Sequence, residues 1–596
     1  MDRNSTIGLV LITALLFVYF AFFAPDSQKI AEEQAAEQAK TEAIKPQPEV
    51  SPELDSSKIG SLSSLIRGEA KEYYLENNDI QVFFSSKGGK VTRVLAKNYK
   101  TYEKQPVWLV DEAATQLSFD LPLAKETVNL YTLGFDKVQQ GTKGDSTTLT
   151  FLAETGAGHF IQQTYALPKE GFTLAYTLQT QGIGELNKDK NVQFSWKQKL
   201  RNFEKDAEQN RLSSTINYYT SNESFQKLNE TSKEALTEKV EESVKWVALK
   251  EKFFNTAIIA KDKFTNVELA SSVDLSDTEF IKYLSAHLEF PANSLSQQQG
   301  VGFTYYFGPN QYQICKKVTD GFEENVYLGW PILNNLNRFV TVPIFNLLEK
   351  FISNYGLVIL LLVVIIKLIL FPLSYRSYLS MAKMRVLKPE MDELKARYGD
   401  DLQKSQAETM KLYQSVGVNP LNGCIPVLLT MPVLLAIFNF FPNSIELRQK
   451  AFLWADDLST YDVISQLPFS IPFYGDHVSL FTILMTISTL IYTWYNNQVS
   501  ASTMQGPMVA MSYIMPVVFM FVLNSLPAAL SYYYFVSNVV TIGQQMLIKS
   551  FVNETKIREQ LDANKVKIAS QPQKQNRLMK RLEEAMKAQE ETKKRK

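Results

Sequence analysis

One lysine stands inside a long apolar run, and it is the first candidate in this sequence for a chemical role. Lys367 lies in the run 355–373, whereas the four apolar runs that follow contain no Asp, Glu, Lys or Arg. A charged side chain within a membrane segment is costly and usually marks a function. Its ammonium group can attract an acidic segment, or its four-carbon stem can carry it to the lipid headgroups as a positioning charge. Both interpretations stay open.

The other reactive residue types are sparse. The two cysteines, Cys315 and Cys424, are isolated, and the three histidines, His159, His287 and His477, are scattered without a ligand cluster. The sequence contains neither a glycine-rich phosphate loop nor a recognisable nucleophile triad or acid and base pair. We therefore expect no metal, no cofactor and no enzyme activity.

Six apolar segments have the length and composition expected of helices that cross the roughly 30 Å hydrocarbon layer of a bilayer. They cover residues 7–24, 355–373, 421–441, 478–495, 509–523 and 529–548. Phe23 and Pro25 flank Ala24 and make a poor cleavage site, so residues 1–24 are predicted to be an uncleaved anchor, with a signal peptide as the alternative. Residues 354–374 are assigned as the second transmembrane helix, and residues 418–548 as the third to sixth.

A polar linker and a β-rich domain separate the anchor from the other five segments. Residues 25–69 have few large apolar side chains and are predicted to be a flexible linker. Residues 70–329 contain short segments of period two and hairpin turns, which predict a large antiparallel β-sandwich outside the cytoplasm. A charged interlude at 221–244 is predicted to be helical. Four aromatic residues can pack in the core or line a sugar or peptide cleft, and core packing is the simpler interpretation: Trp196, Trp246, Phe253 and Phe254.

Three further segments are amphipathic or charged. Residues 330–353 have apolar side chains at spacings of three and four, which predicts an amphipathic helix at the membrane interface. Residues 375–417 are predicted to be a cytoplasmic helical hairpin, with a solvated charged loop as the alternative. Residues 549–596 form a basic tail with 14 basic and seven acidic residues. Its last four residues are ribosome-contact candidates because ribosomal RNA is a polyanion, while binding to anionic lipid is the alternative: Lys593, Lys594, Arg595 and Lys596.

Charge distribution predicts the orientation. Positive charge favours the cytoplasmic side, which places the 375–417 loop and the tail there. An even number of crossings then puts both termini in the cytoplasm and the β-sandwich on the outer side of the membrane.

Several motifs resemble one family of membrane proteins. They are Met381-Ala-Lys-Met-Arg385, Val418-Asn-Pro-Leu-Asn-Gly-Cys-Ile-Pro426, Met431-Pro432, Glu446-Leu-Arg448, Tyr533-Tyr-Phe-Val-Ser-Asn538 and Tyr305-Tyr-Phe-Gly-Pro309. In this combination and order the chain resembles the YidC/Oxa1/Alb3 family of membrane protein insertases, in its large Gram-negative form. The Asp2-Arg-Asn4 start is similar to the Bacteroidetes branch.

The resemblance implies a five-helix insertase core with a β-supersandwich-like periplasmic domain in the bacterial inner membrane. It implies a groove, open to cytoplasm and lipid, in which Lys367 occupies a position where arginine is familiar. Lysine keeps the charge but lacks the planar fork of arginine. The other groove residues carried over are Thr430, Tyr534, Ser537 and Asn538. The implied partners are nascent membrane proteins, the Sec translocon, the ribosome and membrane lipids.

Two other functions compete with the insertase interpretation. A transporter or channel can also carry one lysine in a span, although no second intramembrane charge or internal repeat is evident. A sugar-processing or lipid-modifying enzyme would use the β-domain as its catalytic part.

Overall fold

The computed structural model describes most of the chain. Its described residues are 60–66, 69–156, 158–183, 186–187, 189–292, 295, 300–398, 402–419, 421–472, 474–499 and 507–570. The predicted anchor, most of the linker, and the tail end with its four ribosome-contact candidates lie outside these ranges. The chain divides into two compact units, Met1–Val326 and Tyr327–Lys596.

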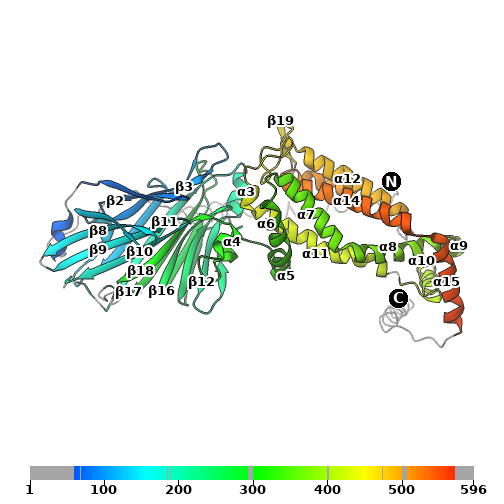
Figure 1. Cartoon of the computed structure of the whole chain (residues 1–596), viewed down its shortest axis with the longest axis horizontal. Helices are drawn as coiled ribbons and strands as arrows, with labels where there is room; N and C mark the ends of the chain where they lie inside the picture. The colour runs from blue at the N-terminus through cyan, green and yellow to red at the C-terminus, as the bar shows by residue number, and fades with distance from the viewer. Residues whose placement is uncertain are drawn as a thin grey trace, which may run out of the picture. The chain divides into compact units, whose positions relative to one another are not determined.

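The first unit is built from antiparallel strands after a short 3-10 helix, η1 (Gly60–Ile66). A four-stranded sheet, in spatial order β1-β2-β3-β4, comes first. Its strands are β1 (Glu72–Glu76), β2 (Ile80–Ser85), β3 (Lys90–Lys100) and β4 (Pro106–Val110). The remaining strands form one continuous sheet that folds into two layers (Figure 1).

The first layer of this sheet contains β5, β6, β11, β14 and β17. Their bounds are β5 (Thr115–Pro122), β6 (Thr127–Asn129), β11 (Asn191–Arg201), β14 (Leu236–Val240) and β17 (Phe280–Pro291). The second layer comprises β7 (Lys137–Lys143), β8 (Ser146–Gly156), β9 (His159–Pro168), β10 (Thr173–Gln181), β12 (Thr215–Thr220), β13 (Phe225–Lys227), β15 (Val244–Lys250) and β18 (Val301–Pro309). The short helices of this unit are η2 (Leu130–Thr132), α3 (Ala207–Leu212), α4 (Tyr312–Cys315) and η4 (Phe322–Asn325).

One long strand, β16 (Phe254–Ser272), joins the two layers. Its first part pairs with β15 and β18, and its second part pairs with β14 and β17. Aromatic rings from the two layers meet in the core: the ring centroids of Phe194 and Phe303 lie 5.7 Å apart, and those of Trp196 and Tyr305 lie 5.9 Å apart. The predicted β-sandwich is therefore confirmed.

The strands follow from alternation in the sequence. In β11 every second side chain is buried, as expected for a strand with one face on the core. The four aromatic residues considered for a cleft are all buried, so for them the core-packing interpretation is correct. The predicted helix at 221–244 is wrong: this segment contains β13 and β14, because pairing of β14 with β16 overrides local helix propensity.

The second unit is mainly helical. Its interfacial segment contains α5 (Pro331–Leu336), a π-helical turn, η5 (Asn337–Thr341), and α6 (Val342–Glu349). The other helices are α7 (Tyr355–Ile369), α8 (Phe371–Val386), α9 (Lys388–Tyr398), α10 (Leu402–Ser415), α11 (Leu421–Asn443), α12 (Leu480–Val499), α13 (Pro507–Leu523), α14 (Ala528–Phe551) and α15 (Glu554–Ala569). A 3-10 turn, η6 (Ile445–Leu447), and a hairpin of β19 (Ser465–Ile471) and β20 (Gly475–Val478) connect α11 to α12.

Each of the five predicted C-terminal spans coincides with a helix, namely α7, α11, α12, α13 and α14. Among the described residues, no single helix combines the length and hydropathy of a membrane span; α7 and α8 reach them only together, with a bend of 62° between them. Pro372 stands in the first turn of α8, and proline restricts the residue before it, which accounts for the break. The number of membrane crossings stays a prediction.

The interfacial segment has an exposed apolar face. Ile332, Phe339 and Phe351 are largely exposed, whereas Leu333 and Phe345 are buried. This distribution is what a helix lying along a lipid surface would present, so its place at the membrane interface remains our prediction.

Candidate functional site

Lys367 lies near the end of α7, a helix capped at its start by the Asn354 side chain, which accepts a hydrogen bond from the Leu357 amide at 3.2 Å. The lysine is half-buried, while Leu368 and Ile369 beside it are exposed. Within the described part of the chain, no carboxylate lies within ion-pair distance of its ammonium group. The charge is thus available to a passing anionic group.

Helix α14 packs against α7 (Figure 1), and one hydrogen bond between the two helices is made at Lys367. The Gln544 side-chain amide donates to the Lys367 carbonyl at 3.1 Å. Gln544 ends a polar stripe of half-buried side chains on one face of α14, spaced by three, four and three residues: Tyr534, Ser537, Thr541 and Gln544.

The stripe separates Lys367 from Tyr534. Gln544 lies ten positions after Tyr534, which is about 15 Å along a helix axis. Among the described residues, neither Tyr534 nor Ser537 makes a hydrogen bond to Lys367. The structure therefore joins Gln544 to the backbone of Lys367, and Ser537 and Thr541 lie between Gln544 and Tyr534 along α14.

Thr541 and Gln544 were missed by sequence reasoning. Both belong to the run 529–548, and the three-four-three spacing of its polar residues is the signal that could have identified them. Thr541 donates to the Ser537 carbonyl at 2.6 Å, so the hydroxyl is held close to its own helix.

Asn538 is turned toward a different helix. Its amide donates to the Ser488 hydroxyl at 3.0 Å and to the Thr489 hydroxyl at 2.9 Å, both on α12. This contact is one rung of a ladder between α12 and α14, whose other rungs are Thr482 with Ser531 at 3.4 Å and Gln545 with Asn496 at 3.2 Å.

The ladder has a constant register. In each rung one α14 residue lies 49 positions after its α12 partner, and the rungs recur every seven residues. This is the heptad repeat of side-by-side helices. The two helices therefore run in the same direction, and polar groups hold them in register.

Thr430 lies on α11, which packs against α8 and α14. It is half-buried. The predicted site residues are thus distributed over α7, α11 and α14, and the hydrogen bond from Gln544 connects Lys367 to α14.

A buried polar network lies at the starts of α12 and α14, at the end of α14 opposite to Gln544. Asp462 is buried and accepts hydrogen bonds from the Leu480 amide and the Trp454 indole, each at 2.8 Å, so it caps the start of α12. Asn524 donates to the carbonyls of Tyr474 and His477, both at 2.8 Å. These contacts satisfy the polar backbone of the connecting loops at this end.

His477 belongs to this buried network, because its carbonyl accepts a hydrogen bond from Asn524. It is buried and stacks on Tyr461 with 3.9 Å between ring centroids. In the residues that the structure describes, no three His, Cys, Asp or Glu side chains gather as a metal site.

The chain matches two family models and many known proteins. The model described as 60Kd inner membrane protein matches residues 347–556, and the model described as YidC periplasmic domain matches residues 72–347. A protein from Amoebophilus asiaticus named Membrane protein insertase YidC is 44% identical over 594 residues, covering 99% of both chains. Proteins of the same name from Cytophaga hutchinsonii and Parabacteroides distasonis are 43% and 34% identical, each over 99% of this chain and 98% of the relative.

Many of these relatives come from Bacteroidetes, as the start of the sequence predicts. Identity at this level over nearly the whole of both chains means that the two units occur together in the relatives as they do here. The chain belongs to the YidC family of membrane protein insertases.

Proposed function

We propose that this protein inserts nascent membrane proteins through a hydrophilic groove whose charged end is Lys367. The observation that carries the proposal is that Lys367 is half-buried and has no carboxylate partner among the described residues, and that its backbone carbonyl is bonded to Gln544, the last residue of the polar stripe of α14. Membership of an insertase family excludes the enzyme alternative.

The physical need for such a groove follows from the cost of moving polar groups through hydrocarbon. A buried polar group without a hydrogen-bond partner costs roughly 2–7 kcal/mol, and an unpaired charge costs more. A stripe of Tyr534, Ser537, Thr541 and Gln544 offers hydroxyl and amide groups along about 15 Å of this path. The apolar part of the substrate moves into lipid, and its burial, at about 25 cal/mol per Å² of apolar area, drives the process.

The remaining residues have supporting roles in this proposal. Thr430 would line the wall contributed by α11. Asn538 would hold α12 in register with α14, since its amide already donates to two α12 hydroxyls. The network around Asp462 and Asn524 would close the groove at its outer end.

The orientation and partners follow from charge. The basic tail and the 375–417 hairpin would face the cytoplasm, with both termini, and the β-sandwich would face the periplasm. The tail would contact the ribosome through Lys593, Lys594, Arg595 and Lys596. The insertase would act alone or with the Sec translocon on nascent inner-membrane proteins, in contact with membrane lipids.

Charge reversal at Lys367 tests the groove. Two unit charges about 8 Å apart at an effective dielectric of about 20 interact by about 2 kcal/mol. Lys367→Ala should therefore lower the rate of insertion of a substrate with an acidic translocated segment by up to about 30-fold, and Lys367→Glu by more, while Lys367→Arg is tolerated. The measurement is insertion in cells of one acidic and one neutral substrate, with protein levels checked.

Lys350→Glu is the matched control, because Lys350 is exposed on the interfacial segment and the substitution makes the same change in charge. If Lys367→Glu inserts the acidic substrate as well as the parent does, Lys367 is only a positioning charge at the headgroups. Equal losses for the acidic and neutral substrates would also contradict an electrostatic role.

A further inference from the structure

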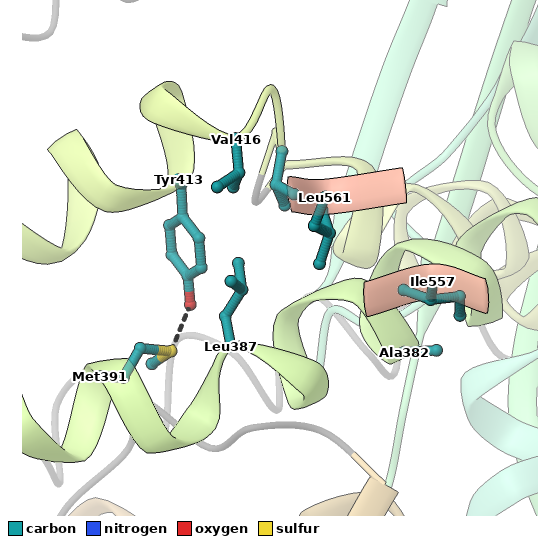
Figure 2. Close-up of a cluster of buried hydrophobic side chains, with 8 residues drawn as sticks. Ala382, Leu387, Met391, Tyr413, Val416, Ile557 and Leu561 are labelled. Atoms are coloured by element: carbon teal, nitrogen blue, oxygen red, sulfur yellow. Dashed lines mark hydrogen bonds between the residues drawn. The ribbon is translucent and has the colours of Figure 1, made fainter. Parts of the chain in front are cut away.

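The first part of the basic tail forms a helix, α15, that packs against α8 and α10. Figure 2 shows Leu561 of α15 beside Val416 and Ile557 beside Ala382. These side chains belong to one buried cluster that also contains Leu387 and Tyr413. Ile557 and Leu561 are four residues apart and so lie on one face of the helix. Both are buried.

The surface that receives these side chains is built by three consecutive helices that lie far from α15 in sequence. Ala382 belongs to α8, Leu387 ends α8, Met391 belongs to α9 and Tyr413 belongs to α10. The Tyr413 hydroxyl lies 3.1 Å from the Met391 sulfur, which ties α9 to α10 (Figure 2). Without α15 this apolar surface would face water, which is unfavourable.

Ionic contacts surround the apolar cluster. Arg558 forms an ion pair with Glu390 at the start of α9 and donates to the Val386 carbonyl at 3.1 Å. Arg385 donates to Glu554 at 2.5 Å. Burial raises the pKa of Glu390, but the hydrogen bond from Arg558, a backbone hydrogen bond and the positive charges of Arg558 and Lys565 together outweigh burial, so the pKa lies below its ordinary value. Bonds of this kind are directional, so they fix the angle of α15 on the hairpin.

The connection to α14 is short. Helix α14 ends at Phe551 and α15 begins at Glu554, and the Asn553 side chain accepts hydrogen bonds from the amides of Thr555 and Lys556 at 3.0 and 3.2 Å. This cap sets the direction of α15 as the chain leaves α14.

We propose that α15 is a clamp that holds the 375–417 hairpin in a fixed place at the end of α14. The hairpin is connected to the helical unit through α8 and the start of α11, and α15 adds a third connection that crosses both arms. The proposed clamp consists of α15 alone. The inference concerns how the hairpin is held and does not depend on the groove.

Two truncations separate the clamp from the rest of the tail. In the purified full-length protein, hydrogen exchange should show slow amide exchange in α9 and α10. Removal of residues 571–596 should leave these rates unchanged, whereas removal of 554–596 should raise them by about tenfold or more. Unchanged rates after the longer truncation, or equal acceleration by both, would overturn the proposal.

A charge exchange tests the interface without removing the helix. Arg558→Glu should accelerate exchange in α9 and α10, and adding Glu390→Arg should restore much of the protection. Lys556→Glu is the matched control, because Lys556 is exposed and forms no ion pair with any described residue. If Lys556→Glu accelerates exchange as much as Arg558→Glu, or if the double variant gives no rescue, the ionic contacts do not hold the clamp.

Discussion

Replacing Asn538 by leucine should weaken the contact between α12 and α14 without changing which substrates are inserted. The side chain is buried, and its two amide hydrogens are both donated to α12 hydroxyls. The change removes two interhelical hydrogen bonds and keeps the side-chain volume similar. The expected result is a less stable helical unit that still inserts substrates when folded.

The expected loss of unfolding free energy depends on whether the two α12 hydroxyls keep hydrogen-bond partners after the substitution. The Ser488 and Thr489 hydroxyls donate to the Met485 carbonyl at 2.8 and 2.7 Å, so each keeps a hydrogen-bond partner after the change. Interhelical hydrogen bonds in membrane proteins contribute about 0.6 kcal/mol on average. Two of them give a loss of about 1 kcal/mol, which corresponds to a fall in Tm of about 2–4 °C for a unit of this size.

The assay is thermal unfolding of the purified protein in detergent, followed by tryptophan fluorescence, beside insertion in cells at a permissive temperature. Ser537→Ala is the control, since Ser537 has no described side-chain partner on α12 and should change the unfolding free energy by less than about 0.5 kcal/mol. An Asn538→Leu variant that unfolds at the parent temperature but fails to insert substrates would refute the reasoning. It would show that the amide contacts substrate.

Three further predictions concern orientation, the tail and the β-sandwich. Reporters fused after Gly399 and after Lys596 should read cytoplasmic and one placed within 147–178 should read external; a cytoplasmic β-sandwich would contradict the positive-inside assignment. Removal of residues 571–596 should abolish salt-sensitive cosedimentation with ribosomes even though α15 is retained, and equal binding by both forms would remove this tail segment from the contact. Burial lowers the pKa of Lys282 to about 8 from an ordinary 10.5, so above about pH 8 the unfolded state binds the proton that the folded state has lost. The unfolding free energy should therefore rise with pH from about 8 to 9.5, and thermal unfolding of Lys282→Met should show a smaller rise; an unchanged profile would contradict this account.

Helix positions and the sandwich could be predicted because they depend on local patterns. The apolar runs are continuous, so the helices α7, α11, α12, α13 and α14 could be placed within a few residues. Alternation of apolar and polar side chains along segments such as β11 predicted the strands of the sandwich in the same way. The path of β16 could not be predicted, because its transfer between layers depends on partners that lie far apart in sequence.

The contacts of the site were harder to predict than its helices. Asn538 was placed in the groove by a resemblance of motif, but its partners depend on the register of α12 against α14, which a span assignment does not contain. The helix α15 falls in a segment that composition describes only as basic. Its docking depends on contacts of Ile557 and Leu561 with residues more than 130 positions earlier in the sequence, and no local sequence pattern indicates such contacts.

The two polar faces of α14 differ in how their hydrogen bonds are satisfied, and this difference bears on function. Ser531, Asn538 and Gln545 have side-chain partners on α12. The Gln545 Oε1 atom makes no hydrogen bond to a described residue, but it is buried. Thr541 and Gln544 donate only to backbone carbonyls among the described residues, and their oxygen atoms retain lone pairs that can accept hydrogen bonds from a passing chain. A peptide segment leaving water needs both acceptors for its amide groups and a counter-charge for its carboxylates. The face that ends near Lys367 would offer both, whereas the acceptor that remains on the face toward α12 is buried. We therefore propose that the groove lies on the former face.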